Sequence, residues 1–138
     1  MHIPLRAVVL ATAVAEAMPA LAHHSFAAEY DANRPITLAG TVTRIELINP
    51  HAWLYIEVRD AQGKASQWNI EMGAPNALIR RGVNKNSVPV GAKVTVDGYR
   101  AKDGTNTVNS TTIKLADGRS LFSGSSNSGA PGAPPTAQ

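Results

Sequence analysis

The sequence predicts a mostly β protein, a small five-stranded barrel of the OB type with one short helix between the third and fourth strands. Three observations predict it: apolar and polar residues alternate over several short segments, glycine-containing turns separate paired segments, and a short helical segment lies in the middle. Three strands, a short helix and two strands is the element order of an OB-fold. A two-sheet sandwich is the alternative, but it normally needs about seven strands.

The first three strands are expected in the first half of the chain. Residues 37–48 are rich in Thr, Val and Ile, and residues 52–60 alternate aliphatic with aromatic or polar side chains. The turn sequence at residues 61–64 leads into residues 66–72, where Trp68, Ile70 and Met72 share one face. These segments predict a strand followed by a hairpin.

The helix and the remaining strands follow. Pro75 at the start and Gly82 just past the end predict a short helix over residues 75–81. Two further strands are expected, joined by a turn and followed by a short extension: residues 93–100, the turn Asp103-Gly104, residues 107–115, and the segment after Asp117-Gly118. A second hairpin therefore closes the predicted sheet.

The two ends of the chain differ from its middle. Residues 1–22 combine Arg6, an apolar stretch and small residues before position 23, which is typical of an export signal. That stretch is too short to span a bilayer, which needs about 20 apolar residues. Residues 123–138 are mainly Ser, Gly, Pro and Ala, so we expect a disordered tail. The prediction is one domain at residues 23–122, periplasmic or secreted, with no transmembrane segment in the mature chain.

The amino-acid composition argues against several classes of function. The chain has no cysteine, which excludes disulfides and thiolate chemistry. Its net charge of +3 is scattered, whereas nucleic-acid binding usually shows clustered Lys and Arg, so no nucleic-acid partner is expected. The serines lie in no recognisable nucleophile motif, and we therefore predict that the protein is not an enzyme.

The histidines suggest a metal site. Cleavage after residue 22 makes His23 the mature N-terminus, whose α-amine and imidazole can together chelate a transition metal. His24 follows, and His51 stands at the entry to the second strand. Nitrogen ligands in a roughly planar arrangement favour Cu(II), whereas a tetrahedral set can hold zinc. Copper bound by His23, His51 and further donors is the predicted function. The alternative interpretation is that His23 and His24 form a disordered leader.

Further ligands can come from the opposite strand of the hairpin. The predicted pairing places Glu71 or Met72 near His51, but only one of them can share its face of the sheet. A methionine ligand would favour Cu(I). In the alternative interpretation, Met72 fills the core and Glu71 is a solvated strand residue.

The second predicted strand also suggests a site without metal. His51, Trp53 and Tyr55 share one face, and Leu54, Ile56 and Val58 share the other. If the aliphatic face is inside, His51, Trp53 and Tyr55 form an exposed aromatic strip that can bind a ligand. If the aromatic face is inside, His51 is only a residue at the rim of the barrel. The alternative function is therefore a metal-free module that binds an envelope protein, a peptide or an oligosaccharide.

Three motifs carry a resemblance to a known family. They are HHSFAAEYD at residues 23–31, NPHAW at residues 49–53 and GYRAKDG at residues 98–104. With them the chain resembles an uncharacterised family of small exported bacterial proteins, a domain of unknown function. The resemblance covers roughly residues 23–122 and implies export and a single β-rich domain. It implies no activity, substrate or cofactor.

Overall fold

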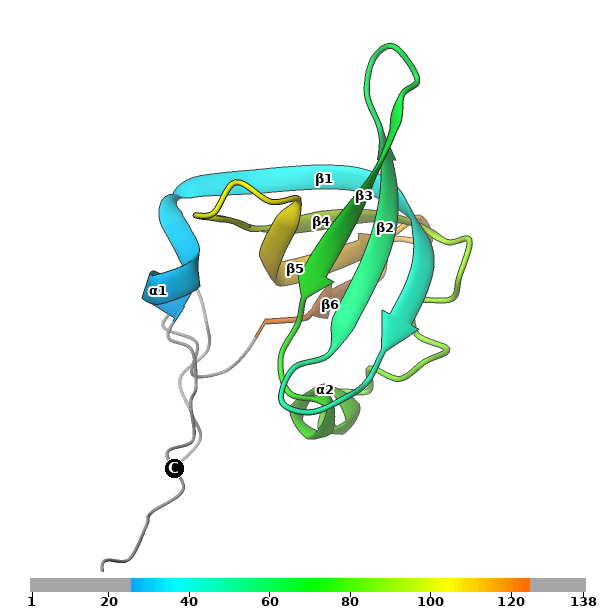
Figure 1. Cartoon of the computed structure of the whole chain (residues 1–138). Helices are drawn as coiled ribbons and strands as arrows, with labels where there is room; N and C mark the ends of the chain where they lie inside the picture. Colours follow the sequence, from blue (N-terminus) through cyan, green and yellow to red (C-terminus); the bar gives the residue numbers. More distant parts are fainter. Residues whose placement is uncertain (1–25, 125–138) are drawn as a thin grey trace, which may run out of the picture.

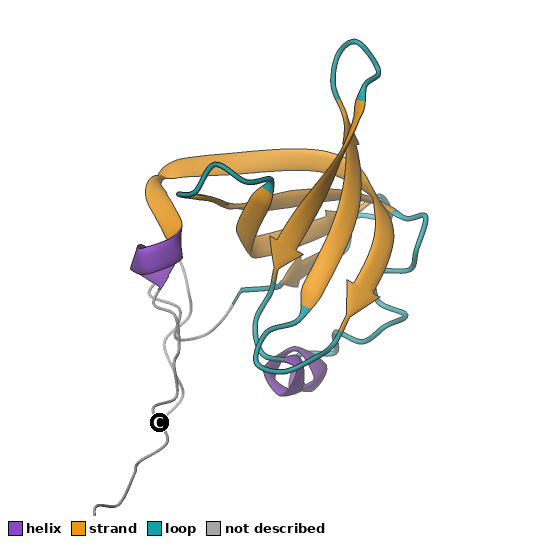
Figure 2. Ribbon diagram, in the orientation of Figure 1, coloured by secondary structure: helices purple, strands orange, loops and turns teal. Residues whose placement is uncertain are grey.

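The computed structural model describes residues 26–124, apart from the side chain of Phe122. Its elements are, in chain order, α1 (Phe26–Glu29), β1 (Tyr30–Glu46), β2 (Trp53–Arg59), β3 (Ala65–Glu71), α2 (Pro75–Arg80), β4 (Lys93–Ala101), β5 (Thr107–Leu115) and β6 (Ser120–Phe122). The strands curl around one another, and the β2–β3 hairpin projects beyond the rest (Figures 1 and 2). Helix α2 lies at the opposite end from the hairpin tip, and α1 lies beside the start of β1.

The strands form one sheet that closes on itself. Its order is β3-β2-β1-β4-β5-β6, and β3 also pairs in parallel with β5 through Asn69 to Glu71 and Thr107 to Asn109. This last pairing joins the two sides of the sheet into a barrel, with α2 between β3 and β4 in sequence. The predicted OB-like barrel is confirmed. The short extension expected after Asp117-Gly118 is the sixth strand, β6.

The N-terminal part of the barrel differs from the prediction. β1 begins at Tyr30 rather than near residue 37, and the short helix α1, which was not predicted, precedes it. Residues 30–36 include Asn33 and Pro35, which are poor strand formers. Their strand conformation comes from pairing with β4, in which Tyr30 faces Ala101 and Pro35 faces Tyr99. A pairing of segments so distant in sequence leaves no local signal.

The barrel core contains the aliphatic face of β2 and the inward face of β3, together with inward residues of β1, β4 and β5 and of α2. Leu54 and Ile56 are fully buried, and so is Ile70. Because side chains alternate along a strand, His51, Trp53 and Tyr55 lie on the outer face. A second, smaller cluster lies outside the barrel and consists of Phe26, Tyr30 and Ala101 with Tyr99 packed against them.

Ser123, the residue after β6, is hydrogen-bonded to the barrel through both its hydroxyl and its carbonyl. Ser123, which the sequence assigned to the tail, is completely buried. Its hydroxyl donates to the Ser110 hydroxyl at 2.8 Å, and its carbonyl accepts from the Gly73 N–H at 2.8 Å. The fold therefore includes Ser123. Residues 125–138 of the predicted tail, and residues 1–22 of the predicted export signal, lie outside the described residues.

The close approach of β4 and β5 gives a stability prediction. A Cβ atom at Gly98 would overlap the Asn109 carbonyl oxygen and lie 2.9 Å from the Ser110 Cα. Gly98→Ala should therefore lower the free energy of unfolding by about 1–3 kcal/mol, since the clash is with backbone. Urea unfolding followed by circular dichroism measures this change. Gly63→Ala is the comparison, because nothing lies within 4 Å there and only its φ of 82° opposes a side chain. An unchanged midpoint for Gly98→Ala would contradict the tight pairing.

Candidate functional site

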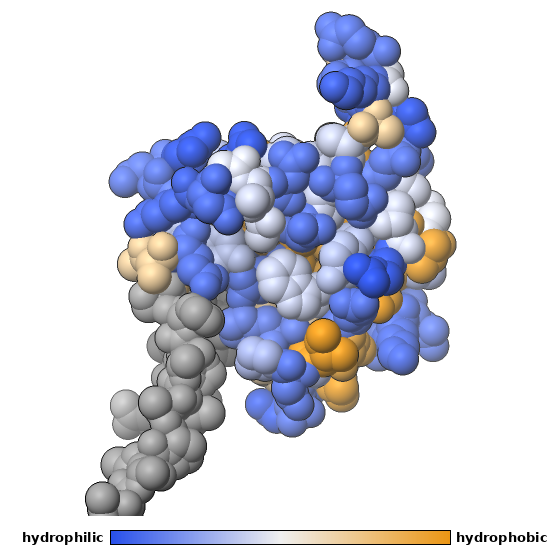
Figure 3. Space-filling model, in the orientation of Figure 1, coloured by the Kyte–Doolittle hydropathy of each residue, from blue (hydrophilic) through white to orange (hydrophobic). Residues whose placement is uncertain are grey.

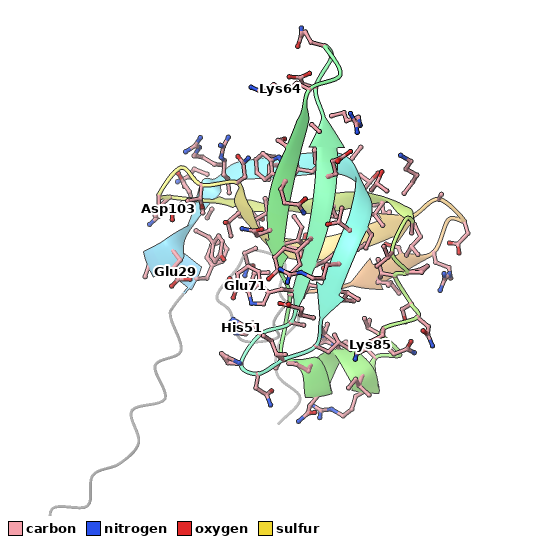
Figure 4. All side chains as sticks on the ribbon, turned by 45° about the vertical axis from the view of Figure 1, so that its right-hand side comes forward. Glu29, His51, Lys64, Glu71, Lys85 and Asp103 are labelled. Atoms are coloured by element: carbon pink, nitrogen blue, oxygen red, sulfur yellow. The ribbon has the colours of Figure 1, made fainter. Side chains whose placement is uncertain are left out.

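The structure joins His51 to Glu71. His51 precedes β2, and Glu71 is the last residue of β3, directly opposite Trp53 in the hairpin register. The His51 Nδ1 contacts the Glu71 Oε1, and the two side chains lie together on the outer face of the hairpin (Figure 4). The predicted hairpin therefore does bring a β3 side chain to His51, and that side chain is Glu71.

Glu71 is buried although it points away from the barrel core. Only 5% of its surface is exposed, because Tyr30 covers it. The Tyr30 hydroxyl donates to the Glu71 Oε2, so each carboxylate oxygen has its own partner. The backbone is held as well, since the Ser110 hydroxyl donates to the Glu71 carbonyl at 2.8 Å. A buried carboxylate needs such partners, because an unpaired buried charge is strongly unfavourable.

The segment that supplies Tyr30 is itself held against the barrel. The Phe26 ring stacks on the Tyr30 ring with a centroid distance of 5.8 Å, and it meets Tyr99 edge-on at 5.4 Å. Lys102 adds two hydrogen bonds, from its Nζ to the Ala27 carbonyl at 2.5 Å and from its N–H to the Glu29 carbonyl at 2.8 Å. Helix α1 and the start of β1 therefore form a fixed cover over Glu71.

Charge and burial set the protonation states in this group. The hydrogen bond to Glu71 raises the pKa of His51 above its usual value against the opposing effect of burial, and the charges of Glu71 and Glu29 add to the rise. Burial, the hydrogen bond to Glu71 and the nearby carboxylates raise the pKa of Tyr30. Tyr30 is therefore a hydrogen-bond donor at any physiological pH. A neutral His51 that donates from Nδ1 keeps the lone pair of Nε2 free.

The structure tests which predicted metal ligands meet. Met72 is 2% exposed and belongs to the hydrophobic core, on the opposite face of β3 from Glu71, so it does not lie beside His51. His23 and His24 lie outside the described residues. Within residues 26–124, no group of three His, Cys, Asp or Glu side chains could hold a metal ion. In the described part of the chain, the carboxylate in direct contact with His51 is that of Glu71.

The aromatic strip on β2 lies on the outer face, as the aliphatic-inside alternative predicts, but both rings are half-buried and their surroundings differ. Tyr55 is engaged locally: its hydroxyl donates to Glu46 at 3.0 Å, and the Arg44 guanidinium carbon lies 3.9 Å from its ring centroid. Trp53 instead lines a groove of about 560 Å³ together with residues of α1, β1 and the β4–β5 hairpin: Ala28, Glu29, Tyr30, Ala101, Lys102, Asp103, Thr105 and Thr107. The face seen in Figure 3 is mostly hydrophilic.

A model of a known family matches residues 11–110. The chain belongs to DUF6152, a family of unknown function. The structure is similar to the N-terminal domain of PriB protein from Thermoanaerobacter tencongensis, with 21% identity and a TM-score of 0.40 over 61% of this chain and 97% of that chain. A comparison with the curated proteins found no match. Within residues 26–124, no helix has the length and apolar character needed to cross a membrane.

The sequence did not predict the two residues that form the cover over Glu71. They are Tyr30, whose hydroxyl binds the carboxylate, and Phe26, which stacks on Tyr30. Both stand in the first motif, HHSFAAEYD, but outside every predicted strand and helix. Their spacing of four residues was the available signal, because residues four apart share a face when the intervening chain is helical. α1 provides that helical turn.

The ion pair predicts how His51 titrates in the metal-free protein. Its pKa should lie above 6.5, so its contribution to stability is full below about pH 6.5 and is lost as the pH rises through the folded-state pKa. Glu71→Gln keeps the side-chain shape but removes the charge, and should lower the His51 pKa. NMR titration of the His51 ring in the presence of a chelator measures both values. A His51 pKa that is the same in the two proteins would contradict the assigned contact.

Proposed function

We propose that the mature protein is an exported β-barrel protein that binds Cu(II) through the Nε2 of His51 and through the α-amine and imidazole of His23. One observation carries this proposal: the Nδ1 of His51 is held by a buried carboxylate that is itself hydrogen-bonded by Tyr30. Metal-binding histidines usually have their second ring nitrogen fixed by a carboxylate or carbonyl in this way, which sets the tautomer and the ring orientation. His51 is partly exposed, at 24% of its side chain, so a ligand can reach it.

The role proposed for Glu71 differs from that predicted by the sequence. Both of its oxygens are already engaged, by His51 and by Tyr30, and it is buried. Glu71 therefore acts as the orienting partner of His51 rather than as a metal ligand. The ligand set is then rich in nitrogen, which favours Cu(II).

The position of α1 supports the participation of the N-terminus. Phe26, the first described residue, stacks on Tyr30, whose hydroxyl binds Glu71, the partner of His51. His23 stands three positions before Phe26, and an extended chain over three positions spans about 10 Å. The proposed site requires the chain before Phe26 to bring His23 to His51, and His24 is then available as a further donor.

The ligand assignment is tested by copper affinity. Protein that begins at His23 should lose more than about tenfold in Cu(II) affinity, or about 1.4 kcal/mol, when His51 is replaced by Ala, because a preorganised ligand is removed. One additional residue before His23 should cause a comparable loss, since it removes the terminal amine from the chelate. Competition titration with a chromogenic chelator measures both. Gln62→Ala, at the exposed tip of the β2–β3 hairpin, is the control. Equal affinities of the wild type and His51→Ala would contradict the proposal.

A second candidate function is favoured by the groove at Trp53. In this alternative, the domain binds an oligosaccharide, a peptide or an envelope protein without metal. The groove is concave and combines an aromatic ring with hydroxyl and charged groups, as small-ligand sites do.

The two tryptophans of the chain make this candidate testable. Trp68 is only 8% exposed and lies in the core. Trp68→Phe leaves Trp53 as the remaining tryptophan, so the tryptophan fluorescence of this protein reports on Trp53 alone. Addition of soluble peptidoglycan fragments should change its fluorescence, and Trp53→Phe should abolish binding measured by calorimetry. Binding through the groove should be unaffected by an extra residue before His23. If the fragments bind equally well to Trp53→Phe, the groove is not the site.

A further inference from the structure

We infer that Tyr30 is a positioning residue for the proposed metal site: its hydroxyl holds Glu71 in the orientation that directs the free Nε2 of His51 outward. This inference rests on the proposed function, because Tyr30 itself contacts Glu71 and not the metal. It assigns to the N-terminal cover a role beyond packing.

The contacts around Tyr30 leave its hydroxyl little freedom. Tyr30 is 4% exposed, its ring stacks on Phe26, and its backbone pairs with Ala101 of β4. A buried hydroxyl needs a partner, and the one that Tyr30 has is the Glu71 Oε2. Because β3 and α1 are each fixed, this hydrogen bond sets the rotation of the Glu71 carboxylate.

The orientation of that carboxylate decides what His51 can do. With the Glu71 Oε1 beside Nδ1, a neutral imidazole carries its proton on Nδ1 and has its lone pair on Nε2. Without the Tyr30 hydrogen bond, the carboxylate can rotate, and the proton can occupy either ring nitrogen. A proton on Nε2 would block coordination through that atom, so the tautomer is the quantity that Tyr30 controls.

The segment formed by α1 and Tyr30 thus contributes to the proposed site in two ways. α1 follows the proposed ligand His23 closely in sequence. Tyr30, the first residue after α1, fixes the orientation of the other proposed ligand, His51. Displacing α1 from the barrel would remove both contributions at once. Copper binding is therefore expected to depend on the docking of α1, although α1 itself contains no proposed metal ligand.

The experiment compares Tyr30→Phe with Tyr55→Phe. The first removes the hydroxyl that binds Glu71 and keeps the ring; the second removes a hydroxyl that binds Glu46, on the same outer face. Nitrogen-15 NMR of the metal-free protein, at a pH where His51 is neutral, reports which ring nitrogen carries the proton. We expect the wild type and Tyr55→Phe to be protonated at Nδ1 and Tyr30→Phe to shift toward Nε2. Cu(II) affinity should fall about 10- to 100-fold in Tyr30→Phe and stay within twofold of the wild type in Tyr55→Phe.

The outcomes separate the inference from the proposed function. An unchanged tautomer and unchanged affinity in Tyr30→Phe would overturn the inference, even if the wild type binds copper tightly. A shifted tautomer in a protein that binds no copper would support the positioning of His51 and overturn the metal site. If Tyr30→Phe does not fold, Glu71→Asp replaces it, since the shorter side chain cannot meet Tyr30 and His51 together. Glu71→Asp should show the same shift toward Nε2, and an unchanged tautomer would overturn the inference.

Discussion

The burial of one carboxylate, that of Glu71, is the constraint on which the rest of the site depends. Glu71 points away from the barrel core and is still only 5% exposed, so its two oxygens require partners within the protein. Tyr30 and His51 provide them, and each comes from a different part of the chain. The carboxylate therefore fixes the N-terminal cover and the segment before β2 relative to each other. Removing one partner would leave a buried charge partly uncompensated.

The barrel makes this arrangement rigid. The parallel pairing of β3 with β5 sets Glu71 opposite Asn109, and the hydroxyl of Ser110 holds the Glu71 carbonyl. The closure that completes the OB-like barrel thus also fixes the backbone that carries the site. Glu71 lies on a paired strand and His51 shortly before one, and positions held by paired strands keep their geometry more closely than positions on loops, as the proposed coordination by His51 requires.

Much of the barrel could be predicted because its signals are local. The alternation around Leu54 and Ile56, and the proline at the start of α2, are visible in short stretches of sequence. The choice between Glu71 and Met72 was not predictable, since a shift of one residue in register exchanges the two faces of a strand. The first part of β1 and the role of Tyr30 could not be predicted either. Both depend on pairing with β4, about seventy residues away in the sequence.

The central claim is that His51 and the mature N-terminus form one copper site on this barrel. Electron paramagnetic resonance tests it most directly, on protein whose His23 terminus is verified by intact mass and which is loaded with one equivalent of Cu(II). A single, well-defined spectrum with several nitrogen couplings, which changes when His51 is replaced by Ala, is the predicted result. A heterogeneous spectrum that is the same in wild type and His51→Ala would contradict the claim, since it would describe a terminal peptide chelate independent of the barrel.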